Sequence, residues 1–522
     1  MNTSRCEVHA GAVVGFSGIL RTGHPAEVLV EFSCGCRVRT TGPVEVGPFR
    51  SSNRGTVSGW DPTSGLVRRG ALSMVPVYYT TRSTPAGAAV SFSTRLGDLV
   101  DAQTPVLDTA VAALLAGGDV PAPLTVYQDV FRLPPGTGVG IAGGRQRLHH
   151  ETFDYTGLEV SRRRDRRASA LLAEALAEAL DDIPHHPIVG VSGGAGSTVV
   201  GRVGNRPMVH VHVDLPVLAA RRERLDSTVE VIDGTPWWRR ICGDALPPYL
   251  EELDPWLVTL TATNAGTPVS ALGLAHLFAT VPGRRQWWRS GWRLLSVAEP
   301  PPQLYGKPWW SAWWRPTAQS TNPESADAEP SAHPWLTPQA LSTGATASNA
   351  RIPSHLVAGH DPIVAAIAQR TLDLLDRVED CRGVRTSVPV LIATHPAVVG
   401  AALVVARRNG RRKADQRGLP AALGGLLPEP WRPADPPPLP RLRLLAAAFV
   451  QEQLGSEQRR VDLLEKVEDT AWIDAAHLKE VLADPRERLR SAVSLLRLCA
   501  TVARFPQVLR RKLMILEADG HG

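Results

Sequence analysis

A glycine-rich turn near position 190 has the residue types and spacing of an anion-binding site. A short β-branched run that ends at Val191 leads into Ser192-Gly193-Gly194-Ala195-Gly196-Ser197, and a helix is predicted to open at Ser197 and Thr198. A strand, a glycine turn and a helix N-terminus aim backbone N–H groups and a helix dipole at an anion. Glycine lets the backbone approach the ligand closely. The candidate phosphate-binding residues are Ser192, Gly193, Gly194, Gly196, Ser197 and Thr198.

Two common phosphate-binding patterns do not fit this turn. The P-loop ends in Gly-Lys-Ser/Thr and the dinucleotide fingerprint reads G-x-G-x-x-G, and neither is present here. The turn instead resembles the pyrophosphate loop of the asparagine synthetase family, Ser-Gly-Gly-x-Asp-Ser. Where that family has a magnesium-binding aspartate, this chain has Gly196. The resemblance implies ATP as a weakly bound or vestigial cofactor, and Gly196 argues against Mg²⁺.

Further segments resemble the same family, in the same order. Val126–Gly136, which reads V-Y-Q-D-V-F-R-L-P-P-G, resembles the segment that closes the family's N-terminal amidotransferase-like domain. Ser58–Tyr79 resembles its "D-x-x-G…P-x-Y-Y" strand pair. Three later segments, Pro334–Pro338 (P-W-L-T-P), Gly418–Pro428 and, more loosely, Ala471–Asp474, resemble lasso-peptide macrolactam cyclases. The chain is therefore most similar to these cyclases.

The family's remaining catalytic groups are replaced in this chain. The nearest counterpart of its second acidic loop, "L-x-G-x-G-G-D-E", is Leu295–Pro302, in which only Glu299 is acidic. Counting back from Pro428 places Gln416 at the family's catalytic lysine, with Lys413 one helical turn away. The resemblance makes Lys413 and Glu299 the candidate catalytic residues, with Asp214 as a further substitute.

The N-terminal domain is expected to lack glutaminase activity. Such a domain needs an N-terminal cysteine whose α-amino group serves as the base. Position two is Asn2, and Cys6 would be exposed only by cleavage after Arg5. We interpret the domain as a retained scaffold.

The expected fold class is α/β, which becomes α+β when the chain is taken as a whole, and two domains are expected. Residues 1–150 are predicted to form a β-rich, amidotransferase-like (Ntn-type) sandwich, in which Ala26–Phe32 pairs with Arg37–Thr41 and Leu72–Thr81 pairs with Gly87–Ser93. Residues 160–522 are expected to form an adenine-nucleotide α-hydrolase-like (PP-loop) domain. It comprises a mobile linker at 317–351, rich in Ser, Thr, Ala, Pro and Asn, and a helical part at 360–522.

Apolar periodicity predicts the helices. Asp108 is expected to cap a helix that ends at Ala116, and a second helix is expected at Ser161–Leu180. In the C-terminal part, helices are expected at Ile363–Val378, Pro396–Arg408, Arg441–Gln453, Arg459–Glu468, Asp474–Leu482 and Arg486–Ala503. Only about ten residues separate Ser197 from the strand Met208–Val213, which predicts a shortened crossover. On that strand, His210 and His212 share a face, either as metal ligands or, as we favour, as packed or surface residues.

Composition excludes several classes of protein. The chain has 522 residues, 43% of them apolar, which is typical of globular proteins. No apolar run reaches the roughly 18 residues of a membrane span, and we expect a cytoplasmic protein without a membrane partner. Six dispersed cysteines make no disulfide framework. The net charge is +6, with 5 lysines against 52 arginines, a bias typical of genomic composition that does not favour nucleic acid as the partner.

Tryptophan is concentrated between positions 237 and 314. Ten of the 14 tryptophans lie there, most of them in pairs next to arginines. This composition suits either a surface that holds a peptide by burial and cation–π contact or a core rebuilt with large side chains. A peptide substrate or partner enzyme that binds region 237–314 is the expected partner.

Two functions remain open at this point. One is an ATP-dependent, AMP-forming amide ligase of the asparagine synthetase type, acting in lasso-peptide macrolactam formation with a rebuilt site. The other is a catalytically inactive pseudoenzyme that binds a peptide or partner enzyme.

Overall fold

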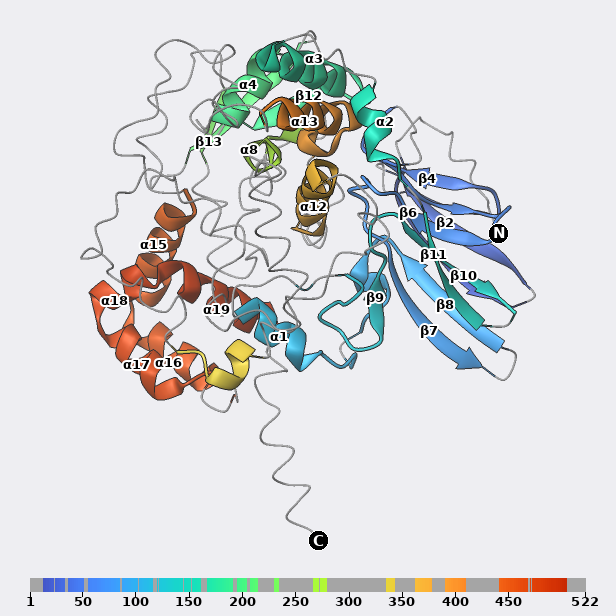
Figure 1. Ribbon diagram of the computed structural model, residues 1–522. Coiled ribbons are helices and arrows are strands. Elements are labelled where there is room, and N and C mark those ends of the chain that lie inside the picture. Colours follow the sequence, from blue (N-terminus) through green and yellow to red (C-terminus); the bar gives the residue numbers. More distant parts are fainter. Residues whose placement is uncertain are drawn as a thin grey trace.

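The computed structural model has a mixed α/β architecture with antiparallel and parallel sheets (Figure 1). It describes residues 13–22, 24–32, 36–50, 55–84, 87–101, 103–115, 120, 122–143, 145–151, 153–160, 167–190, 195–203, 207–214, 230–233, 266–271, 273–278, 335–342, 362–377, 390–409, 441–467, 470 and 472–504. None of the helices in these ranges has the length and apolar character of a membrane span.

The N-terminal part is a sandwich of two antiparallel sheets. The first sheet has the order β3 (Arg37–Thr40), β2 (His24–Phe32), β1 (Val13–Arg21), β8 (Gly87–Ser93), β7 (Tyr78–Thr84) and β9 (Val130–Arg132). The second has the order β11 (Arg145–His150), β10 (Thr137–Ala142), β6 (Leu66–Arg69), β5 (Ser58–Asp61) and β4 (Val44–Val46). Side chains of both sheets share one core, in which Trp60 stacks on Phe92 with ring centroids 6.4 Å apart.

The predicted strand pairs of the sandwich are present. β2 pairs with β3 and β7 pairs with β8, both antiparallel. The strand expected from Leu72 begins only at Tyr78. The residues before Tyr78 do not extend the strand. Two of them, Leu72 and Met74, are buried in a core shared with the helices that follow the sandwich.

A parallel five-stranded sheet forms the centre of the second part. Its order is β14 (Glu230–Asp233), β13 (Val209–Asp214), β12 (Pro187–Gly190), β15 (Thr267–Ser270) and β16 (Val390–Leu391). Numbered along the chain this is 3-2-1-4-5, an order found in doubly wound sheets. The nine-residue helix α4 (Ala195–Val203) connects β12 to β13, so the short crossover still completes a parallel pair.

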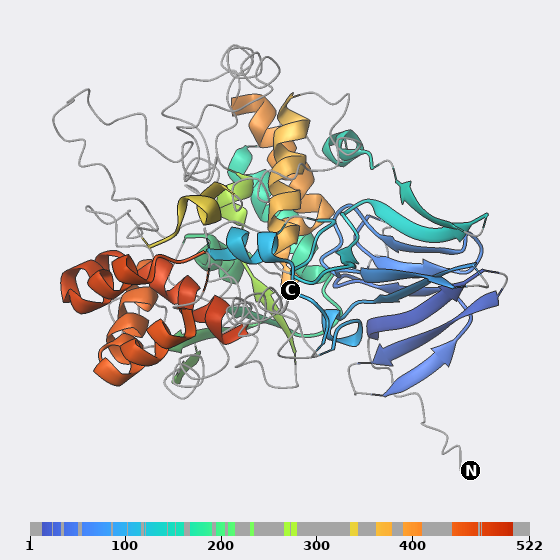
Figure 2. The ribbon, with the colours of Figure 1, turned by 90° about the horizontal axis from the view of Figure 1, so that it is seen from below.

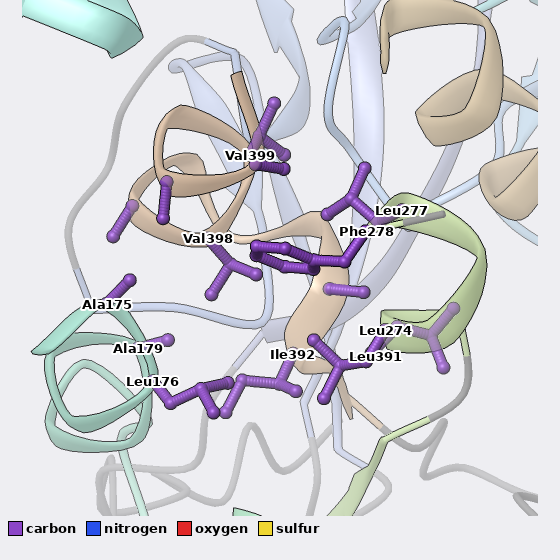
Figure 3. Close-up of a cluster of buried hydrophobic side chains, with 14 of the residues drawn as sticks. Ala175, Leu176, Ala179, Leu274, Leu277, Phe278, Leu391, Ile392, Val398 and Val399 are labelled. Carbon is purple, nitrogen blue, oxygen red and sulfur yellow. The ribbon is translucent and has the colours of Figure 1, made fainter. Parts of the chain in front are cut away.

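Helices bury the apolar faces of this sheet. They are α2 (Tyr155–Val160), α3 (Ala168–Asp181), α8 (Leu274–Leu277), α12 (Pro362–Arg377) and α13 (Pro396–Asn409). Figure 3 shows Leu176 and Ala179 of α3 facing Ile392 and Val398, with Phe278 on the other side of the same cluster. Helix α13 is apolar on nearly every face because it packs against both α3 and α2.

The remaining helices form a separate core. They are α15 (Arg441–Leu454), α16 (Glu457–Val467), α17 (Ala475–Ala483), α18 (Pro485–Arg490) and α19 (Ala492–Arg504). Helix α1 (Asp108–Leu115), although early in the sequence, packs against α19 in this core (Figure 1). Trp335, Leu336 and Ala340 belong to it as well.

Several sequence predictions need correction at the level of boundaries. Asp108 is the first residue of α1 and not its cap, since the Ala110 and Val111 N–H groups donate to the Leu107 carbonyl. The helix expected at Ser161–Leu180 begins at Ala168 within the described residues. The helix expected at Arg486–Ala503 is two helices that break at Ser491. The linker 317–351 contains an anchored segment, 335–342, in which Trp335, Leu336 and Ala340 are buried.

Candidate functional site

The strand order places a topological switch point at the carboxyl end of β12. Chain connections from β12 lead to β13 on one side, and β15 lies on the other side. Open α/β sheets bind ligands outside the carboxyl ends of their strands, at the point where the strand order reverses. Helix α4, which contains the last residues of the turn singled out in the sequence, is the next described element after β12, so its N-terminus lies at this switch point.

Helix α4 begins at Ala195, two residues earlier than predicted. Gly196, Ser197 and Thr198 therefore lie in its first turn, at the helix end that carries the positive pole of the helix dipole. Val199 and Val200 are fully buried and fix this helix against the sheet. Ser192, Gly193 and Gly194 lie outside the described residues.

A second turn faces the first turn of α4. It follows β15 and runs from Ser270, which is buried, through Ala271 to Gly273. A Cβ placed on Gly196 would lie 3.6 Å from both the carbonyl oxygen and the Cβ of Ala271. The two turns are thus in van der Waals range of each other, and position 196 has room for a small side chain.

Gly273 gives the second turn its shape. Its φ of +83° lies in the left-handed region that favours glycine. A Cβ there would lie 2.4 Å from Leu374 Cδ2. The Leu277 N–H donates to the Gly273 carbonyl at 2.7 Å, which starts helix α8 immediately after the turn.

This second turn was not predicted from the sequence. The segment predicted as the counterpart of the family's second loop, Leu295–Pro302 with Glu299, lies outside the described residues. Within the described part of the chain, β15 flanks β12 on the side opposite β13, and Ala271, directly after β15, is the turn residue beside Gly196. The available signal was Gly273, three residues after the short segment Thr267–Ser270 that forms β15.

Charged groups are sparse in the described part of the site. The first turn of α4 carries no acidic residue. Asp214 and Asp233 lie opposite each other at the carboxyl ends of β13 and β14. Within the described ranges, no three His, Cys, Asp or Glu side chains come together as a metal site. Lys413 and Gln416 are outside the described residues, as are the paired tryptophans of region 237–314.

His210 packs between β13 and α4. Its Nε2 would lie 3.5 Å from a Cβ on Gly201, and this nitrogen is buried without a hydrogen-bond partner among the described residues. His212 belongs to the same strand, and the packing of its side chain is outside what the structure describes.

A buried histidine that sequence reasoning missed joins α3 to α13. The Nδ1 atom of His395 accepts the Ala397 N–H at 3.2 Å, so Nε2 carries the proton and donates to Asp182 Oδ2 at 3.2 Å. The ring meets Phe49 edge-on with centroids 4.6 Å apart. His395 therefore contacts the start of α13, the end of α3 and Phe49 of the N-terminal part simultaneously. These contacts give it a structural role.

A scan against protein-family models finds no match for this chain, and a search of curated proteins finds no similar sequence.

Proposed function

We propose that this chain is an asparagine-synthetase-like protein, with an Ntn-type sandwich and a PP-loop domain, that binds the phosphates of ATP at the β12–α4 turn. One observation carries the proposal: Gly196, in the first turn of the helix that follows the central strand of a 3-2-1-4-5 sheet, lies at the switch point beside Ala271 in the turn after β15. Helix α4 supplies N–H donors to the phosphates there.

The reaction proposed is amide-bond formation on a peptide. By its resemblance, the protein transfers AMP from ATP to a peptide carboxylate and releases pyrophosphate. An amine of the peptide then attacks the acyl carbon of the adenylate, which forms the amide bond and releases AMP and a proton. The N–H groups of the glycine turn stabilise charge on the phosphates. Lys413 and Glu299 are the proposed charged groups, and region 237–314 is the proposed peptide-binding surface.

A second function is favoured by Gly196. Position 196 has room for a Cβ, yet it carries no carboxylate at the place of the family's magnesium-binding aspartate. Loss of one charge-stabilising contact costs about 2.7–4 kcal/mol of transition-state stabilisation. This observation supports a pseudoenzyme that keeps the anion-binding turn and uses the fold to bind a peptide or partner enzyme.

Isotope exchange between ATP and pyrophosphate separates the two functions. A ligase catalyses exchange when a candidate peptide carboxylate is present, whereas a pseudoenzyme binds nucleotide without exchange. Failure to bind ATP, pyrophosphate or inorganic phosphate in calorimetry contradicts both. The wild-type chain should bind ATP with little dependence on Mg²⁺.

Gly196→Asp is the matched variant. The Cβ of the new side chain makes ordinary van der Waals contact with Ala271, and the added carboxylate should make ATP binding tighter with Mg²⁺ by tenfold or more, about 1.4 kcal/mol. Gly97→Asp, in another surface turn with open space around the new Cβ, is the control and should leave binding unchanged. Equal Mg²⁺ dependence in the wild type and Gly196→Asp would contradict this placement of the site.

A further inference from the structure

Strand β11 is an exposed edge of the sandwich. It ends the order of its sheet, and its edge opposite β10 pairs with no described strand. Five of its six residues are exposed, and Leu148 keeps 46% of its surface accessible. In Figure 2 the teal strands β10 and β11 lie at the margin of the sandwich. An edge of this kind presents backbone N–H and C=O groups that can pair with another chain.

The side chains of β11 are strongly basic. The sequence of the strand is Arg-Gln-Arg-Leu-His-His, with no acidic residue. Gln146 hydrogen-bonds to Tyr79 and so faces the other sheet. Because side chains alternate along a strand, Arg145, Arg147 and His149 project on the opposite face, about 6.6 Å apart.

The positive charge of β11 is not neutralised by its neighbour. Across the pair, Arg145 faces Ala142, Arg147 faces Gly140 and His149 faces Gly138. Neither Arg145 nor Arg147 makes an ion pair or side-chain hydrogen bond with any residue that the structure describes.

The edge strand of the other sheet is different, although it carries the same Arg-x-Arg spacing. On β3, Arg39 lies 3.2 Å from Glu27, and Arg37 lies 3.8 Å from Glu31. Charged residues on an edge strand can protect it from aggregation, and on β3 the basic residues are paired with glutamates of the neighbouring strand β2. The unpaired arginines of β11 leave charge available for a partner.

We propose that β11 binds an acidic peptide segment in extended conformation, which adds to the five-stranded sheet as a new strand. The backbone edge supplies the main-chain hydrogen bonds, and alternate acidic residues of the peptide meet Arg145, Arg147 and His149. A polypeptide is favoured over nucleic acid because the free edge offers donors and acceptors in the pattern of a β-ladder. This surface is separate from the nucleotide site, so its test does not depend on the proposed ATP chemistry.

The test uses the full chain and a fluorescein-labelled peptide of about ten residues with alternating Glu and Val, long enough to span β11. Fluorescence anisotropy should detect binding, and Arg145→Glu/Arg147→Glu should weaken it at least tenfold, about 1.4 kcal/mol. Arg145→Gln/Arg147→Gln should weaken it less. The matched control is Arg37→Glu/Arg39→Glu on β3, which should change the affinity less than about twofold, because those arginines are already paired. Circular dichroism and the melting temperature check that each variant is folded.

Two further measurements distinguish strand addition from simple charge attraction. Hydrogen exchange should slow at the amides of β11 when the peptide binds, and a peptide N-methylated at alternate amides should bind at least tenfold more weakly. Absence of peptide binding, or equal binding of the N-methylated peptide, overturns the proposal. Tighter binding of a single-stranded oligonucleotide that is lost in the same Arg145/Arg147 variant also overturns it.

Discussion

Tyr155 buries a hydroxyl group for which the described residues provide no hydrogen bond. Its side chain is fully buried beside Phe153, with ring centroids 4.9 Å apart, and burial raises its pKa above the ordinary value. A buried polar group without a partner costs free energy, so its removal at constant shape is neutral or stabilising. Tyr155→Phe should therefore leave the free energy of unfolding unchanged or raise it by up to about 1 kcal/mol, as measured by urea denaturation.

Tyr79→Phe is the control for this prediction. Tyr79 is also a buried side chain, although its hydroxyl is less deeply buried, and this hydroxyl is hydrogen-bonded to Gln146. Its loss should cost about 1 kcal/mol. A larger loss of stability in Tyr155→Phe than in Tyr79→Phe would mean that the Tyr155 hydroxyl has a bound partner.

Gly273 is the second residue whose backbone can be tested directly. Gly273→Ala places a Cβ at positive φ and within 2.4 Å of Leu374, so it should lower the free energy of unfolding by about 1–3 kcal/mol. Gly65→Ala has a similar φ of +65° but open space around the new Cβ, and it should cost only about 1 kcal/mol. Equal costs for the two variants would show that Leu374 moves aside without penalty.

At the scale of single elements, Trp335 shows that the average composition of a segment can predict its structure wrongly. Segment 317–351 is polar and rich in proline, and its average properties predict a mobile linker. Trp335 nevertheless keeps only 1% of its surface exposed. Its carbonyl accepts the Asp474 N–H at 2.8 Å, and the Thr337 N–H donates to Trp472 at 3.1 Å. One large side chain with two backbone bonds is enough to order a short segment inside a polar stretch.

Trp335→Ala should lower the free energy of unfolding by about 3–5 kcal/mol, because it leaves a large cavity between α1 and the C-terminal helices. Leu341→Ala lies in the same segment but at a side chain that is 40% exposed, and it should cost less than about 1 kcal/mol. Chemical denaturation monitored by far-ultraviolet circular dichroism measures both. Similar, small costs would mean that the segment is not anchored through Trp335.

The candidate site was predictable in one half only. The turn after β12 was found because adjacent glycines next to a β-branched run have a local physical meaning. The turn after β15 was missed because its partner, Gly196, is more than seventy residues away, and only strand order brings the two together.

Helices with long apolar stripes, such as α12 and α13, were predicted nearly to their ends. The break at Ser491 was missed because a short 490–492 interruption does not alter apolar periodicity.

At the scale of the whole molecule, the sandwich and the parallel sheet share a core. Phe49, Leu72 and Met74 of the N-terminal part are buried in the same cluster as α3 and α13. The Arg50 N–H donates to the Asp182 carbonyl at 2.7 Å, and the Leu391 N–H lies 3.2 Å from Met74 Sδ. No pattern local to residues 47–75 predicts these contacts, since they depend on chain more than 100 residues away.

Arg69 is a fully buried charged residue at this junction. Its guanidinium is fully buried and donates to the carbonyls of Ser73, Leu133 and Leu375, at 3.4, 3.1 and 3.5 Å. Leu375 lies in the last turn of α12, where carbonyl groups lack partners within the helix and favour a positive charge. Arg69→Met keeps the length of the side chain but removes these donors, so it should cost about 3 kcal/mol or more in unfolding free energy. It should also split a single calorimetric unfolding transition into two, because the sandwich and α12 lose a shared contact.

Arg82→Met, at an exposed position of β7, is the control and should change stability by less than about 0.5 kcal/mol. A single transition with unchanged stability in Arg69→Met would contradict this role for Arg69.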